Sequence, residues 1–119
     1  MKLTMPEWDI MEVLWSQERL SLGEITAALK ESHGWASNTV HTYLTRMCKK
    51  GLVIIDKNTS SPYKAAVSKD DCARQERDEL LNKVYSGAAG ELIAAFLKES
   101  EISKSEVDRL KKLLDEMEV

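Results

Sequence analysis

The chain has 119 residues, of which 43% are hydrophobic and 31% charged, as expected for a globular protein with one domain or a small domain and an appended arm. No apolar run approaches the ~20 residues of a membrane-spanning helix, so we expect no membrane insertion. The N-terminus does not resemble a signal peptide, and Cys48 and Cys72 form neither a disulfide framework nor a zinc-binding spacing. We therefore expect a cytoplasmic protein without a metal site or cofactor. The sequence also has no nucleotide-binding or hydrolase motif, so we expect no enzyme.

Charge is distributed unevenly along the chain. The net charge is −3, but residues 1–69 hold 9 Lys/Arg against 7 Asp/Glu, whereas residues 70–119 hold 8 against 13. No acidic residue occurs between positions 32 and 55. A phosphate backbone responds to the local field rather than to the charge of the whole chain. The N-terminal part is therefore compatible with nucleic acid, and the acidic C-terminal part suits a role away from it.

Local signals define the elements in chain order. Thr4 and Ser21 each begin a capping box, which predicts helices over about 6–17 and 21–31. A third helix, 37–49, is followed by two short strand-like runs around the turn-forming sequence NTSS. Three further helices are expected at about 70–84, 87–98 and 103–117. The fold is therefore predicted to be mainly α with a small β-hairpin wing, a winged helix-turn-helix over residues 1–69 followed by a helical dimerisation arm over residues 70–119.

The helix over 37–49 has two faces. Val40, Leu44 and Met47 recur at helical spacing and predict the core side. The other side is polar or basic, and Asn, Thr and Arg are side chains that pair with base edges and phosphates in duplex DNA. A plain solvated face is the alternative, but the acid-free window and the hairpin that follows favour DNA. The candidate contacts on this helix are Ser37, Asn38, Thr39, His41, Thr42 and Arg46.

The hairpin and the end of the third helix supply a second group of candidates. A basic, hydroxyl-rich hairpin tip suits contact with phosphates or with the minor groove. We expect Lys50 and Lys57 to contact the phosphate backbone rather than base edges. Solvated turn residues are the alternative for each position taken singly. The candidates are Lys50, Lys57, Ser61, Tyr63 and Lys64, and the expected partner is double-stranded operator DNA.

The C-terminal arm carries apolar stripes with no internal partner. Three short helices bury too little surface to be stable alone, which favours pairing with a second copy as a homodimer. The alternative is an arm that folds back on its own winged helix. The residues expected at the dimer contact are Leu81, Val84, Leu92, Ile93, Phe96, Leu97, Leu110 and Leu114.

Two segments, PEWDIMEVLW and NTVHTYLTRMCKKGLV, resemble the penicillinase and methicillin-resistance repressor family (BlaI/MecI/CopY), and the resemblance continues more loosely to the end of the chain. It implies a homodimeric winged-helix repressor that acts on a promoter dyad, with Asn38, Thr39, His41, Thr42 and Arg46 on the recognition helix. Ser37 stands where the family usually has proline, and His41 stands where relatives often have a basic residue. The paired cysteines of the copper-responsive branch are absent from this sequence.

The resemblance also implies a way to relieve repression. In the antibiotic-responsive branch, signalling from a membrane sensor-protease ends with a cut at an Asn–Phe bond in the arm. The matching bond here is Ala95–Phe96, which keeps the phenylalanine and lacks the asparagine. The alternative is that Phe96 is a core residue of the arm.

Two other functions remain open from the residues alone. One is a ligand-gated regulator whose effector lies between arm and winged helix. The other is a winged helix that binds a protein, which would favour apolar or acidic residues on the outer face of residues 38–49.

Overall fold

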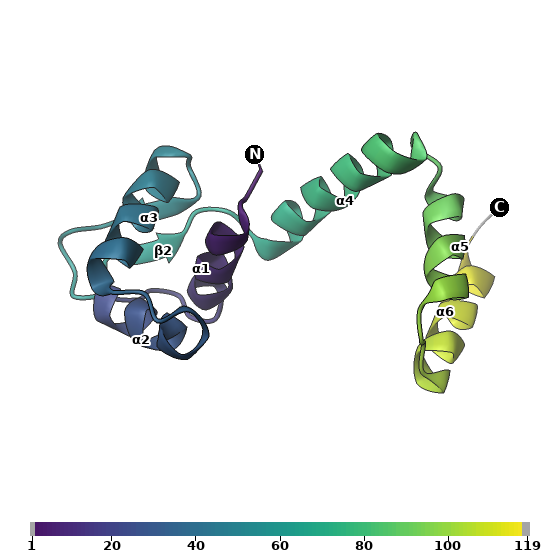
Figure 1. The fold of residues 1–119 in the computed structure, drawn as a ribbon, viewed down its shortest axis with the longest axis horizontal. Helices are drawn as coiled ribbons and strands as arrows, with labels where there is room; N and C mark the ends of the chain where they lie inside the picture. The colour runs from purple at the N-terminus through teal and green to yellow at the C-terminus, as the bar shows by residue number, and fades with distance from the viewer. Residues whose placement is uncertain (1, 118–119) are drawn as a thin grey trace. The chain divides into compact units, whose positions relative to one another are not determined.

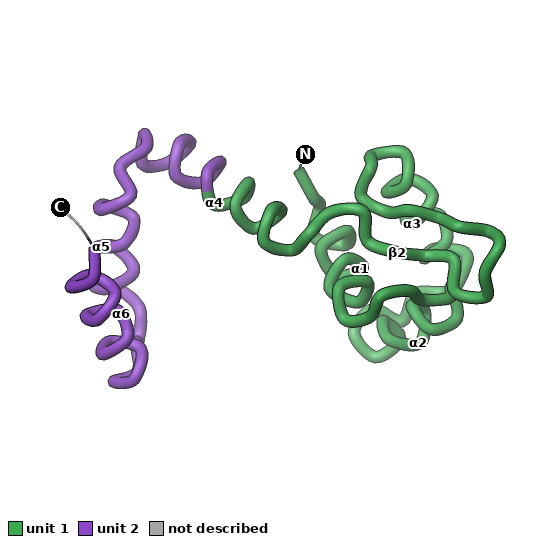
Figure 2. Tube along the Cα trace, turned by 180° about the vertical axis from the view of Figure 1, so that it is seen from behind, with its two compact units in different colours: residues 1–77 green, residues 78–119 purple. Residues whose placement is uncertain are grey.

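The computed structural model describes residues 2–117. The chain divides into two compact units, residues 1–77 and residues 78–119 (Figure 2). The boundary falls inside the helix that spans residues 69–85. The elements of Figure 1 are α1 (Met5–Trp15), α2 (Leu22–His33), α3 (Ser37–Lys49), β1 (Val53–Ile55), β2 (Tyr63–Ala65), α4 (Lys69–Tyr85), α5 (Ala89–Glu99) and α6 (Lys104–Glu116). The predicted winged helix with a helical extension is confirmed, and every predicted helix is present.

The predicted caps form at the starts of α1 and α2. The Thr4 hydroxyl accepts a hydrogen bond from the Glu7 backbone N–H, while the Glu7 carboxylate accepts one from the Thr4 N–H at 2.8 Å. Ser21 and Glu24 make the same reciprocal pair at α2. Such boxes satisfy backbone donors that have no partner within the helix. Gly34 then ends α2 in the left-handed conformation, with φ of 64°, where a side chain would be strained.

The core of the first unit lies between α1, α2, α3 and the hairpin. Helix α1 contacts α2 and β2, and α3 contacts α2 and β1 (Figure 1). The indole N–H of Trp15 donates to the Val67 carbonyl oxygen at 2.9 Å and so ties α1 to the segment after β2. The largest fully buried side chains are Ile10, Met11, Leu14, Ile25, Val40, Leu44, Met47 and Leu52.

The hairpin is short and is held at three places. Strands β1 and β2 are antiparallel, with Ile54 opposite Lys64. The Asp56 N–H donates to the Pro62 carbonyl across the turn at 2.8 Å. On the other side of β2, the backbones of Leu20 and Tyr63 exchange two hydrogen bonds of 3.0 Å. The wing is therefore fixed to the segment between α1 and α2 as well as to α3.

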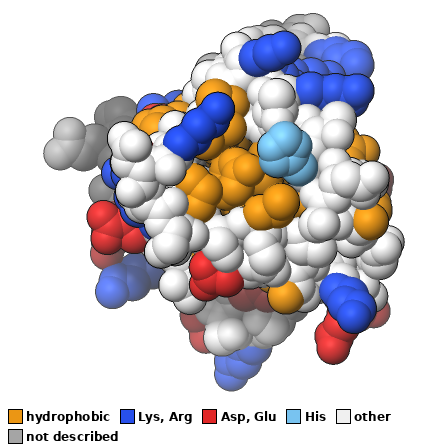
Figure 3. Space-filling model, turned by 90° about the vertical axis from the view of Figure 1, so that its left-hand side faces the viewer, with side chains coloured by type: hydrophobic (Ala, Val, Ile, Leu, Met, Phe, Trp, Pro, Cys, Tyr) orange, Lys and Arg blue, Asp and Glu red, His pale blue; other side chains and the backbone are white. Residues whose placement is uncertain are grey.

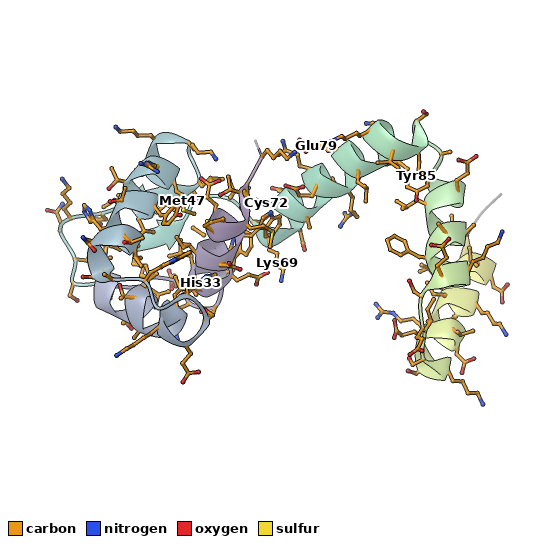
Figure 4. All side chains as sticks on the ribbon, viewed as in Figure 1. His33, Met47, Lys69, Cys72, Glu79 and Tyr85 are labelled. Atoms are coloured by element: carbon orange, nitrogen blue, oxygen red, sulfur yellow. The ribbon has the colours of Figure 1, made fainter. Side chains whose placement is uncertain are left out.

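The first turns of α4 belong to the first unit. Cys72 is only 6% exposed and joins the hydrophobic core (Figure 4). Lys69 and Glu12 form an ion pair of 2.9 Å between α4 and α1. The thiol of Cys72 is buried because α4 begins beside α1. Cys48 is only partly buried.

The second unit has a different character. Within the described residues, neither α5 nor α6 contains a buried side chain. Phe96 is 57% exposed and Leu114 is 58% exposed. Ser103 caps α6 by accepting the Glu106 N–H, and its hydroxyl also donates to the Glu106 carboxylate, so the reciprocal pair seen at α1 and α2 is only half formed here. Within residues 78–117, this unit therefore leaves a large part of its apolar side chains exposed.

Candidate nucleic-acid interface

Helix α3 presents one side to the core and the other to solvent. Val40, Leu44 and Met47 are completely buried, as the helical spacing predicted. The N-terminus of the helix is capped by the Ala36 backbone without a side-chain hydrogen bond. The exposed side chains are Ser37, Asn38, Thr39, His41, Thr42, Thr45, Arg46 and Lys49.

Hydrogen bonds to the helix backbone orient several of these exposed side chains. The hydroxyls of Thr42 and Thr45 donate to the carbonyl oxygens four residues earlier, each at 2.9 Å. Each hydroxyl oxygen therefore still has lone pairs with which to accept. The Asn38 side-chain oxygen accepts the Thr39 N–H at 3.0 Å, and its amide hydrogens remain free to donate. Arg46 makes no ion pair within residues 2–117, so its fork of donors faces outward without a partner.

The turn before α3 is fixed by aromatic stacking. Trp35 stacks on the ring of His33 at a centroid distance of 4.1 Å and lies 5.2 Å from the ring of Tyr43. His33 Nε2 in turn lies 2.8 Å from the Asp9 carboxylate on α1. These contacts connect α1, α2 and α3, and they set the direction in which α3 presents its outer side.

Lys50, predicted from the sequence to contact phosphate, is exposed, but its ammonium is already paired in this structure. Its ammonium donates to both carboxylate oxygens of Glu7, at 2.7 and 2.9 Å. Burial raises the pKa of the Glu7 carboxyl, but hydrogen bonds from Lys50 and from the Thr4 N–H outweigh burial and leave the pKa below its ordinary value of 4.5. In this structure Lys50 neutralises a buried acid, so we no longer count it among the phosphate contacts.

The hairpin residues differ in their exposure. Lys57 is exposed and makes no ion pair within the described chain, whereas Ser61 and Lys64 are partly buried. Tyr63, also predicted from the sequence as a DNA contact, is only 6% exposed and lies in the hydrophobic core. Burial also raises the pKa of its hydroxyl. Tyr63 therefore packs into the core and stabilises the wing.

A hollow of about 470 Å³ separates α3 from the wing. Its floor is apolar, and a histidine and basic side chains surround the hydrophobic patch on this face (Figure 3). The sequence predicted His41, Lys57 and Tyr63 as DNA contacts but not Ile55, Thr59 or Pro62, because nothing in a short turn sequence shows which side chains face the neighbouring helix. The lining residues are His41, Thr45, Ile55, Lys57, Thr59, Pro62 and Tyr63.

The one acidic residue in the hairpin is already paired. Asp56 is the one acid between residues 33 and 69 of the sequence. Its carboxylate lies 4.0 Å from the Arg19 guanidinium, and it also accepts the Asn58 N–H at 3.0 Å. The surface formed by α3 and the hairpin tip therefore combines polar and basic groups with little opposing charge.

The predicted dimer residues all lie in the second unit. Leu81, Leu92 and Leu110 are partly buried, and the others are exposed. Ala95 is partly buried in the middle of α5, beside the exposed Phe96. Tyr85 at the end of α4 (Figure 4) and Leu92 line a hollow of about 280 Å³ with these two residues. The exposed members of the predicted set are Val84, Ile93, Phe96, Leu97 and Leu114.

Other kinds of site find no support in residues 2–117. No group of three or more His, Cys, Asp or Glu side chains is placed to hold a metal ion. No helix in this part of the chain has the length and apolar character to cross a bilayer.

Comparison with known proteins decides the family. The sequence pattern of the penicillinase repressor family matches residues 3–116. The chain belongs to this family. The methicillin resistance regulatory protein MecI of Staphylococcus aureus is 26% identical over 115 residues, which cover 96% of this chain and 94% of the relative. The penicillinase repressor of Staphylococcus aureus is 26% identical over 117 residues, covering 98% and 93%. That of Bacillus licheniformis is 25% identical over 111 residues, covering 92% and 87%.

Family membership confirms two expectations from the sequence. The resemblance inferred from residues 5–55 extends over almost the whole chain. The protein is a transcriptional repressor and not an enzyme.

Proposed function

We propose that two copies of this chain bind an inverted repeat in promoter DNA and thereby block transcription. The observation that carries the proposal is the outer side of α3, where polar and basic side chains stand exposed without an acid among them. Helix α3 enters the major groove, and Asn38, Thr42 and Arg46 contact base edges. Lys57 and the hairpin tip contact the backbone. This function places the protein in the cytoplasm with the chromosome.

The second unit joins the two copies. Within residues 78–117, α5 and α6 contain no buried side chain, and several of their large apolar side chains are exposed. A symmetric pair buries these surfaces and presents two α3 helices to two half-sites related by the same dyad. The acidic balance of residues 70–119 keeps this unit away from the phosphates.

Site selection tests the proposal directly. The purified full chain is incubated with a pool of random duplexes, and bound duplexes are amplified and sequenced over several rounds. We expect an inverted repeat whose half-sites are separated by about one helical turn or a multiple of it. Sedimentation of the free protein should show a dimer at micromolar concentration. A pool that remains random, or a monomer that binds the selected duplex with full affinity, would refute the proposal.

Cleavage in the second unit is the way we propose for repression to end. A cut at Ala95–Phe96 would divide α5 and separate Leu92 and Ile93 from Phe96 and Leu97. Each winged helix would then bind its half-site without the gain of a linked pair, commonly ~10²–10⁴-fold. The exposed Phe96 ring supports access to this bond, whereas its place inside α5 opposes cleavage.

Mass spectrometry of the repressor during induction tests the cleavage step. A fragment that ends at Ala95 supports it, and a chain that stays intact while transcription rises refutes it. A membrane sensor-protease is the partner that this pathway requires. The polar outer side of α3 disfavours the alternative of a protein partner, and a ligand-gated regulator would instead release DNA with the chain intact.

A further inference from the structure

The hollow between α3 and the wing combines an apolar floor with three hydrogen-bond donors. Ile55, Pro62 and the buried Tyr63 form the floor. His41 stands on α3, and Lys57 and Thr59 stand on the hairpin turn. The two groups of donors are 16 residues or more apart in the sequence, so only the folded wing brings them to one place.

The three donors around this hollow donate to no side chain within residues 2–117. The Thr59 hydroxyl oxygen accepts the Ser61 N–H at 3.0 Å, which orients the side chain and leaves its own hydrogen available. The His41 imidazole makes no hydrogen bond, and the Lys57 ammonium makes no ion pair, to any side chain within residues 2–117. Three unpartnered donors at the rim of one hollow match the oxygens of a phosphate.

The apolar floor adds a second requirement. A free inorganic anion gains nothing from Ile55 and Pro62, whereas the carbons of a deoxyribose do. A volume of about 470 Å³ lies within the ~300–1,000 Å³ of ordinary ligand sites, so a sugar and its phosphate fit. If α3 lies in the major groove and the wing on the backbone beside it, the strand between them passes over this hollow.

We propose that the hollow holds one sugar–phosphate unit of the DNA, with the phosphate bound jointly by His41, Lys57 and Thr59. This inference rests on the proposed function and deepens it. Because the phosphate touches α3 and the wing together, it fixes the angle at which the helix enters the groove. Thr59 and Ile55 become interface residues, which no sequence motif suggested.

A scan with uncharged phosphates tests the inference. In the duplex obtained by site selection, each phosphate of a half-site is replaced in turn by a methylphosphonate, and the affinity of the full chain is measured by fluorescence anisotropy. For the unmodified protein, we expect one position at which affinity falls by about tenfold or more. His41→Ala and Thr59→Val should each bind the unmodified duplex more weakly and should each lose sensitivity at that same position.

Matched control variants distinguish the loss of a phosphate contact from an effect on folding. Thr59→Ser retains the hydroxyl and should behave as the unmodified protein does, and so should Gln17→Ala, which changes an exposed residue outside the hollow, α3 and the hairpin. If the His41 and Thr59 variants become insensitive at different positions, or at none, the shared phosphate is refuted while the repressor proposal stands. If the protein selects no duplex at all, both proposals fail.

Discussion

The Glu7–Lys50 pair gives the sharpest test of the structure, because the sequence alone suggested a different role for Lys50. Glu7 is 5% exposed, and the Lys50 ammonium donates both of its short hydrogen bonds to the Glu7 carboxylate. Lys50→Met removes these donors and leaves a buried charge without them. Breaking a fully buried pair costs ~3–5 kcal/mol, but the Lys50 side chain is 38% exposed and water screens part of the interaction. We expect a loss of about 1–3 kcal/mol in the free energy of unfolding.

Urea unfolding followed by tryptophan fluorescence measures this loss. Trp8, Trp15 and Trp35, the chain's three tryptophans, all lie in the first unit, so the signal reports on that unit. With an m-value of about 2 kcal/mol per molar, a loss of about 2 kcal/mol lowers the midpoint by about 1 M urea. Protein concentration is held constant, because association also affects stability. Lys49→Met is the matched control, since the exposed Lys49 makes no ion pair within residues 2–117.

The pH dependence of the stability loss shows whether it comes from the buried Glu7 carboxylate. In the unmodified protein the pKa of Glu7 is lowered, so its stabilising contribution is present above the ordinary value of 4.5 and is lost as the pH falls through the lower folded value. In Lys50→Met only burial and the Thr4 contact remain, so the carboxyl should protonate more readily. The difference in stability should therefore be largest near neutral pH and should shrink as the pH falls below about 4.5.

A substitution of Glu7 completes a double-mutant cycle with Lys50→Met. Glu7→Gln retains the capping box, because glutamine also serves at this position, and removes the buried charge. The double variant Glu7→Gln/Lys50→Met should recover much of the stability lost in Lys50→Met, which measures the coupling between the two residues. If Lys50→Met unfolds as the unmodified protein does but shows a weaker salt dependence of DNA binding, then Lys50 contacts phosphate and our reasoning is wrong.

Further predictions concern DNA contact, the wing and the thiols. Arg46→Ala should cost ~1–3 kcal/mol per half-site and relax preference at one base pair, as site selection with the variant would show. Lys57→Ala should weaken binding to all duplexes and reduce the salt slope by about one per lost contact, and an unchanged slope would contradict the assignment. Tyr63→Ala should lower stability by ~3–5 kcal/mol, whereas Tyr63→Phe should keep normal DNA affinity; a large affinity loss in the latter would return the hydroxyl to the interface. With a thiol reagent, Cys48 should react in the native protein and Cys72 only after unfolding, because burial and then Asp71 and Glu76 raise the pKa of Cys72. Equal rates would contradict this order.

Local signals were sufficient to predict the helices. The capping boxes at Thr4 and Ser21 and the left-handed Gly34 act over three or four residues, so they can be recognised directly in the sequence. The buried side of α3 followed from its helical period. The hairpin was also predicted, because the turn-forming NTSS separates two β-prone runs.

The roles of individual polar residues were harder to predict, because their partners are remote. Lys50 pairs with the Glu7 carboxylate, 43 positions away, and no local sequence pattern predicts such a pair. Tyr63 lies in a strand of three residues, too short for an alternation to show which side faces the core. The conformation of the hairpin turn places Thr59 at the hollow, and the turn sequence does not indicate that position. The sequence therefore predicted which side of α3 is exposed, but not which wing residues are buried or line the hollow.

The uneven placement of the core has a consequence for the dose response of the repressor. Every buried side chain within residues 2–117 lies at or before Cys72, so the first unit can complete its packing while the rest of the chain is still being synthesised. The pairing that we propose through the second unit would then depend on encounter with another copy. While single chains predominate, the concentration of pairs rises with about the square of the total concentration. A cell that halved its supply of this repressor would therefore lose about three quarters of its pairs, and a modest change in synthesis would produce a steep change in transcription.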